Sequence, residues 1–260
     1  MALPFDGPGA SHYSRGLLFV LSAAAAAFAL RVAWEEPLAG AIGLLALLGA
    51  LAARWLLRRR ARKLLRSGNV DSVLQRWSSA LTRVPHPETM GPLMTATAFA
   101  ANGWIERART VLETAERGPA WDAAIEHRLF IDALLLTFEG DTDRALVRAR
   151  RLQQLPLPTA APTLIDKVRV LRSAIAALAR AFCHRGEVGD RRLLMEASDA
   201  SPLVHWAMRY GAAILAVDRG DLHGARALLF GAPQWPTESC FNGFHREISE
   251  ELSRREQAPS

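Results

Sequence analysis

The polar residues that could do chemistry lie near predicted turns, and their spacing fits no familiar catalytic or metal-binding arrangement. The sequence contains no HExxH, GxSxG, Walker phosphate-binding loop or paired CxxC motif. Cys183 and His184 are adjacent, and Asp218, His223 and Glu139 also stand beside predicted turns. Because these residues do not form a spaced set of nucleophile, base and orienting group, solvated turn positions are the simpler interpretation. We therefore expect no enzymatic activity, no metal and no cofactor.

Two weaker possibilities for a polar site stay open. The Pro-rich segment Gln153–Leu164 interrupts the helical pattern and is where an enzyme's site would form, although no metal or nucleophile spacing supports one. His127 falls on the inward side of its predicted helix, where it either contacts a partner or packs against its neighbours.

The distribution of charge argues against nucleic-acid binding, despite a net charge of +6. Residues 1–67 hold nine Lys and Arg against three Asp and Glu, so the rest of the chain is close to neutral. A protein that binds a duplex needs its positive charge on the folded surface. The two cysteines, Cys183 and Cys240, are far apart, which predicts no disulfide framework and fits a reducing compartment.

Two apolar runs near the N-terminus, Leu17–Trp34 and Leu38–Leu57, have the length of membrane-spanning helices. After a short tail at 1–15, they predict a transmembrane helical hairpin over 16–57, closed by the residues EEP at 35–37. A basic cluster follows the second run and should stay cytoplasmic and contact anionic lipid headgroups; its members are Arg58, Arg59, Arg60, Arg62, Lys63 and Arg66.

This interpretation predicts a protein of the inner or plasma membrane with two spans, whose N-terminus and C-terminal domain (58–260) are both cytoplasmic. The first run could instead be a cleaved signal peptide, which would leave the domain on the same side. A buried helical pair in a soluble protein is less favoured, because neither run has a polar face.

From Val70 onward the apolar residues recur at helical spacing, and four segments align without gaps around a glycine. The glycines are Gly103, Gly140, Gly186 and Gly220. Alanine stands seven positions before each glycine, at Ala96, Ala133, Ala179 and Ala213. Five positions after three of the glycines stand Ala108, Ala145 and Ala225, and Arg191 takes this place in the third segment. A glycine that ends one helix and small residues on the facing helices predict closely packed helical hairpins, which bury their apolar faces by stacking.

This pattern resembles the tetratricopeptide repeat (TPR), and the turns EGDTDRA and RGDLHGA match that family well. The resemblance implies an all-α solenoid of four to five units, in which the first helix of each unit lines a groove that binds a protein partner. By repeat position the groove residues would be Leu93, Thr97, Phe130, Leu134, Thr137, Arg180, Tyr210, Ile214 and Val217. This set is mostly apolar and lacks the paired basic clamp for a C-terminal carboxylate, so a hydrophobic or amphipathic helix is the expected occupant, either from a partner or from the chain itself. Burial of several of these positions inside a tightly wound solenoid is the alternative.

The repeat departs from the family in its spacing, since successive glycines are 37, 46 and 34 residues apart. Gly68 lies 35 residues before Gly103, which predicts a partial fifth unit whose first helix continues the second apolar run without a break. The residues Thr237–Gln257 predict a polar helix that caps the C-terminal end of the solenoid.

The sequence thus favours a membrane-anchored cytoplasmic scaffold that binds a protein of unknown identity through a TPR-like groove. The alternative is an accessory subunit of a larger membrane complex that is recognised through the hairpin.

Overall fold

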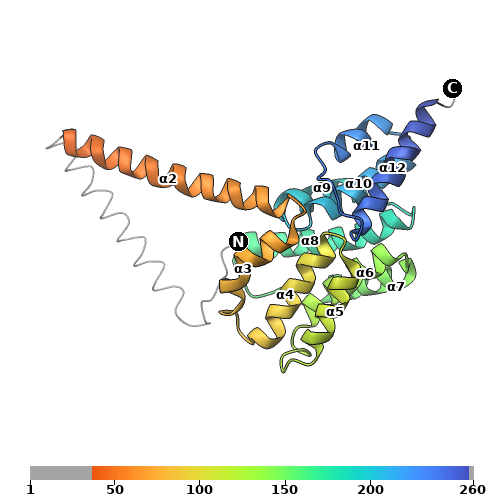
Figure 1. The fold of residues 1–260 in the computed structure, drawn as a ribbon, viewed down its shortest axis with the longest axis horizontal. Helices are drawn as coiled ribbons and strands as arrows, with labels where there is room; N and C mark the ends of the chain where they lie inside the picture. Colours follow the sequence, from red (N-terminus) through yellow and green to blue (C-terminus); the bar gives the residue numbers. More distant parts are fainter. Residues whose placement is uncertain (1–36, 258–260) are drawn as a thin grey trace. The chain divides into compact units, whose positions relative to one another are not determined.

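A computed structural model describes residues 37–257, and this part of the chain is entirely helical (Figure 1). It contains eleven helices and no strand between those limits, which confirms the all-α prediction. The helices are α2 (Pro37–Leu65), α3 (Val70–Leu81), α4 (Pro87–Ala101), α5 (Ile105–Glu116), α6 (Ile125–Glu139), α7 (Thr142–Gln154), α8 (Pro162–Phe182), α9 (Asp190–Ala200), α10 (His205–Asp218), α11 (Leu222–Leu229) and α12 (Cys240–Gln257).

The chain divides into two compact units between Ala61 and Arg62. Most of α2 belongs to the first unit, and its last turn together with α3 to α12 belongs to the second. Helix α2 is unbroken between Leu57 and Leu65, as predicted for the junction of the apolar run with the basic residues.

The second unit is built from four consecutive helix pairs: α4 with α5, α6 with α7, α8 with α9, and α10 with α11. The first helices of the pairs also pack on one another in chain order, α4 on α6, α6 on α8, and α8 on α10. The second helix of a pair contacts the first helix of the next. Each pair therefore buries its apolar side against its neighbours, as the helical-hairpin pattern predicts.

Small residues hold the pairs together at the predicted positions. The four alanines that precede the turns and the three that follow them are all fully buried; they are Ala96, Ala133, Ala179, Ala213, Ala108, Ala145 and Ala225. A methyl side chain lets two helix backbones approach closely, so the alignment correctly placed small residues at buried positions. Ala179 and Ala145 belong to one cluster with Leu136, which is a contact between neighbouring pairs.

Three of the four predicted turn glycines end their helices in the left-handed conformation, with φ of +76° at Gly103, +83° at Gly140 and +75° at Gly220. The third turn differs from the prediction. There His184 takes the left-handed conformation at φ +55°, and Gly186 does not. A Cβ atom at Gly186 would lie 2.1 Å from the Leu215 side chain, so this glycine serves a close contact and not the helix end.

The Pro-rich insertion forms the connection between α7 and α8, and a buried arginine holds it in place. The Arg172 side chain donates to the backbone oxygen of Leu155 at 2.7 Å and pairs with Glu126 at 2.9 Å. Burial of a guanidinium is stable when its donors are satisfied in this way. Arg172 on α8 thus ties the insertion to α6.

The predicted two-span membrane location is wrong for the described part of the chain: no helix within residues 37–257 is both long enough and apolar enough to cross a bilayer. Although α2 begins with the second apolar run, its second half carries six basic residues: Arg54, Arg58, Arg59, Arg60, Arg62 and Lys63. The predicted cytoplasmic orientation of the N-terminus and of the domain depends on the two spans and is not supported without them. The tail at 1–15 and the first run, Leu17–Trp34, lie outside the described residues.

Candidate protein-binding surface

The first helices of the four pairs, α4, α6, α8 and α10, form a continuous surface that we call the first-helix face. The chain's own C-terminal segment, residues 232–257, lies on it. Its helix α12 packs on α10 and α11, as expected for a cap on the last pair. The beginning of α12 and the residues before it also contact the C-terminal ends of α4, α6 and α8, which a terminal cap does not require.

The start of α12 meets the end of α4 through backbone groups. The Cys240 N–H donates to the Gly103 oxygen at 2.9 Å, and the Ser239 hydroxyl donates to the Asn102 oxygen at 2.8 Å. The first N–H groups and the last carbonyls of a helix have no partner within that helix, and they carry opposite partial charges. The contact therefore pairs the first N–H group of α12 with a carbonyl of the turn after α4 and fixes where α12 begins.

Aromatic side chains fill the space beneath α12. Phe241 is fully buried, with its ring centroid 5.3 Å from that of Phe138 on α6 and 5.0 Å from that of Tyr210 on α10. Phe244 lies 5.0 Å from Phe182 on α8. Three ring pairs in this cluster have edge-to-face geometry, and such pairs stabilise beyond the area they bury.

A series of hydrogen-bonding side chains, Trp235, Tyr210 and His245, adds specificity to these contacts. The Trp235 indole N–H donates to the Tyr210 hydroxyl oxygen at 2.7 Å, and the same hydroxyl lies 3.2 Å from Nδ1 of His245. Burial raises the pKa of Tyr210, so the hydroxyl stays protonated and can donate to an acceptor while it accepts from Trp235. Burial likewise raises the pKa of the Cys240 thiol to about 12, which keeps it neutral.

The second half of α12 continues along the same side. Ile248 and Leu252 are buried, and the Arg255 guanidinium donates to the backbone oxygen of Val217 at 2.8 Å. Phe241, Phe244, Ile248 and Leu252 thus follow one another at intervals of three and four residues, which places them on one stripe of the helix.

The groove residues predicted from the repeat register divide into three groups in the structure. Leu93, Leu134 and Thr137 are buried within the helix pairs, where no partner reaches them. Tyr210 and Val217 lie beneath the C-terminal segment through the contacts above.

The remaining groove candidates are partly accessible. Thr97, Phe130 and Ile214 are half-buried, and the Thr97 hydroxyl donates to the Leu93 oxygen. Arg180 is not free to bind a ligand as predicted, because its guanidinium is paired with the buried carboxylate of Asp190, with one N–O distance of 2.8 Å.

The basic residues assigned to a lipid surface lie on α2 and just after it. Arg58, Arg59, Arg60, Arg62 and Lys63 are exposed, and the Arg59 guanidinium stacks on the Trp55 ring at 5.2 Å. Arg66 is half-buried and lies 3.6 Å from the Asp199 carboxylate. Contact of these residues with lipid headgroups stays a prediction.

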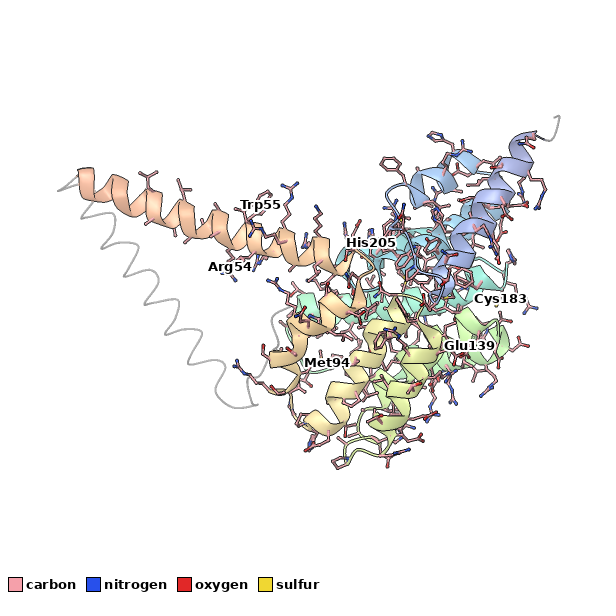
Figure 2. The ribbon with its side chains drawn as sticks, in the orientation of Figure 1. Arg54, Trp55, Met94, Glu139, Cys183 and His205 are labelled. Atoms are coloured by element: carbon pink, nitrogen blue, oxygen red, sulfur yellow. The ribbon has the colours of Figure 1, made fainter. Side chains whose placement is uncertain are left out.

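Three of the residues first considered for chemistry, His184, Asp218 and Glu139, are engaged in pairs near the surface. His184 Nδ1 lies 2.9 Å from the Asp218 carboxylate at the exposed ends of α8 and α10, and Glu139 accepts two hydrogen bonds from Arg109. Figure 2 shows Glu139 and Cys183 at the ends of α6 and α8. His127 and His223 are exposed. No group of three or more His, Cys, Asp or Glu side chains is arranged to hold a metal within the described residues.

A crevice of about 460 Å³ between α6 and α7 is lined by five charged side chains, and four of them pair with one another. Arg128 lies 3.4 Å from Asp122, and Arg148 lies 3.8 Å from Asp132. Burial raises the pKa of Asp132, and the neighbouring arginines partly oppose this. The crevice therefore offers little unpaired charge to a ligand.

Comparison of the chain with protein-family models, with curated proteins and with solved structures finds no match. The assignment of function therefore depends on the geometry of the first-helix face.

Four phenylalanines of this surface were not predicted as site residues: Phe138, Phe182, Phe241 and Phe244. Phe138 and Phe182 stand at the ends of first helices, outside the groove positions of the repeat. The spacing of Phe241, Phe244, Ile248 and Leu252 was present in the sequence, but the many charged residues between them led to the interpretation of Thr237–Gln257 as a polar cap.

Proposed function

We propose that the chain is a protein-interaction module that binds a helical segment of another protein on its first-helix face. One observation carries the proposal: this face accommodates the 18-residue amphipathic helix α12 through an aromatic cluster, with the helix start anchored on the carbonyls of α4. Binding of an amphipathic helix in an apolar groove is a common mode of peptide recognition.

The sequence pattern supports the same proposal from a second direction. We take the four pairs to be TPR-like units because the aligned alanines are buried and because a left-handed glycine follows the first helix in three of the pairs. In that family the first helices bind peptides or proteins. The proposed role is therefore a scaffold or adaptor without a reaction of its own.

The proposal is tested by co-purification of the tagged full-length chain and by a charge placed in the binding surface. Phe182→Glu puts a carboxylate in the pocket that holds Phe244. Val147→Glu is the matched control, because Val147 is exposed on the second helix α7. Both variants are first compared with the parent chain by circular dichroism and size-exclusion chromatography.

We expect a reproducible protein partner to be retained by the parent chain and by Val147→Glu, and lost by Phe182→Glu. A partner that binds the folded Phe182→Glu chain as strongly as the parent chain would show that recognition does not use the first-helix face.

A further inference from the structure

We propose that the partner of this surface is a helix with the aromatic spacing of α12, and that α12 occupies the site until such a helix displaces it. This inference rests on the proposed function, because it names the ligand of the same surface.

The contacts of α12 define the chemistry that a partner must present. Two phenylalanines three residues apart fill the pockets of Phe241 and Phe244, and aliphatic side chains follow at the positions of Ile248 and Leu252. A serine just before the helix supplies a hydroxyl for the Asn102 carbonyl. The partner is therefore an amphipathic helix of at least three turns that begins with Ser-x-Phe-x-x-Phe.

Asn102 and Gly103 make the site selective for the start of a helix. Their carbonyls lie at the C-terminal end of α4 and accept from Ser239 and from the Cys240 N–H. A segment that crossed the face at mid-helix would offer no free N–H at this point, since its amide groups are already paired. The partner's direction along the face is thus the same as that of α12.

The way in which α12 is connected makes displacement physically reasonable. The link from α11 to α12 is not helical, and Phe230 and residues 236–238 within it are exposed. Trp235 in the same link is buried, so displacement removes this residue together with α12. Each helix pair beneath α12 has its own buried alanines, so the packing of the pairs does not depend on contacts with α12 alone. Release of the segment therefore leaves the four pairs in contact with one another through their own cores.

The test measures binding of a fluorescent peptide with the sequence of residues 233–257 to the full-length chain. In the parent chain the site is occupied. The double variant Phe241→Ala/Phe244→Ala weakens the chain's own segment and leaves Phe138, Phe182 and Tyr210 in place to receive the peptide. Arg246→Ala, on the exposed side of α12, is the matched control chain.

We expect the peptide to bind the double variant and to bind the parent chain and Arg246→Ala at least about 30-fold more weakly. A peptide carrying the same two alanines should lose binding to the double variant by a similar factor. Absence of peptide binding to the folded double variant would overturn the inference.

If the double variant does not fold, a nicked chain decides the question. A specific protease site is inserted after Phe230, which is 85% exposed, and the folded chain is cleaved there. Exchange of the cleaved segment for the labelled peptide, and not for its double-alanine form, supports the inference. Failure to exchange under mild denaturant that leaves the helix content intact overturns it.

The result is separate from the test of the proposed function. Peptide exchange without any co-purified partner would support the stated ligand chemistry and count against an interaction module. A co-purified partner that needs Phe182, together with no peptide exchange, would retain the module and reject this ligand.

Discussion

Substitution of Gly103 by alanine should destabilise the chain in two ways that the structure separates. Gly103 has φ of +76°, a conformation that costs an L-residue about 1–2 kcal/mol. A Cβ atom there would also lie 2.8 Å from the Ser239 hydroxyl oxygen, 2.9 Å from the Cys240 sulfur and 3.0 Å from the Phe241 ring. These distances require the C-terminal segment to shift, at a cost of about 1–3 kcal/mol.

Gly140 provides the matched control. Its φ is +83°, and a Cβ atom there would meet nothing within 4 Å. Gly140→Ala should therefore lose only the backbone contribution, about 1–2 kcal/mol. The difference between the losses of unfolding free energy in the two variants, about 1–3 kcal/mol, measures the cost of the steric clash with Ser239, Cys240 and Phe241.

Urea denaturation of the two full-length variants gives the free energies of unfolding, and hydrogen exchange locates the effect. In Gly103→Ala the amides of α12 should exchange faster than in the parent chain, while those of α6 change no more than in Gly140→Ala. Equal destabilisation by both variants, with α12 protected as before, would refute the contact between the α4 turn and the C-terminal segment.

Three further predictions concern buried polar groups. Asp190→Ala should lower the free energy of unfolding by about 3 kcal/mol in urea denaturation, because it leaves the mostly buried guanidinium of Arg180 with only the exposed carboxylate of Glu187, 3.6 Å away. Tyr210→Phe should cost about 1–3 kcal/mol in the same assay, because the buried Trp235 N–H loses its acceptor. Burial lowers the pKa of His205 to about 4, so on acidification this histidine is protonated in the unfolded chain before it is protonated in the folded chain. The contribution of neutral His205 to the free energy of unfolding is therefore fully present above pH 6.5, and up to about 3 kcal/mol is lost as the pH drops toward 4.

Each of these predictions has its own control. Asp166→Ala breaks an exposed pair with Arg169 and should cost under about 0.5 kcal/mol; an equal loss from Asp190→Ala would contradict the role of burial. A double-mutant cycle with Trp235→Phe should show coupling to Tyr210→Phe, and additive losses would exclude the hydrogen bond as the cause. His205→Gln should flatten the stability profile between pH 6.5 and 4, and an unchanged profile would assign the titration to other groups.

The helix pairs could be predicted from the sequence because their cause is local. A left-handed glycine ends a helix wherever it stands, and alanines at fixed distances from it mark where two helices meet. Gly103, Gly140 and Gly220 obey this rule, and the alanines around them are buried.

The third turn shows where that reasoning fails. The gapless alignment assigned the helix end to Gly186, but His184 takes the left-handed conformation there. The reason for Gly186 is a contact with Leu215, on a helix that follows 19 residues later. A single sequence does not distinguish a glycine that is needed because a side chain would clash from a glycine that is needed for a left-handed backbone conformation.

The membrane prediction was based on the apolar length of two runs, of which the second opens the 29-residue helix α2. The continuity of this helix was predicted correctly. A count of apolar residues over one run gave too little weight to the six basic residues in the second half of the same helix.

The candidate site was the least predictable part, because its two halves are far apart in the chain. Gly103 and Ser239 are in contact across more than 130 residues of sequence, and Phe138 meets Phe241 across about 100. The repeat register could indicate which side of each first helix faces the groove, but the C-terminal segment decides which of those residues remain accessible. For Tyr210 and Val217 the predicted position and the covered position are the same, so the helix proposed as a partner would compete with α12 for these residues. Any partner that binds here must therefore offer contacts at least as favourable as those of α12, and this requirement makes the aromatic spacing of α12 the most direct guide to the partner's sequence.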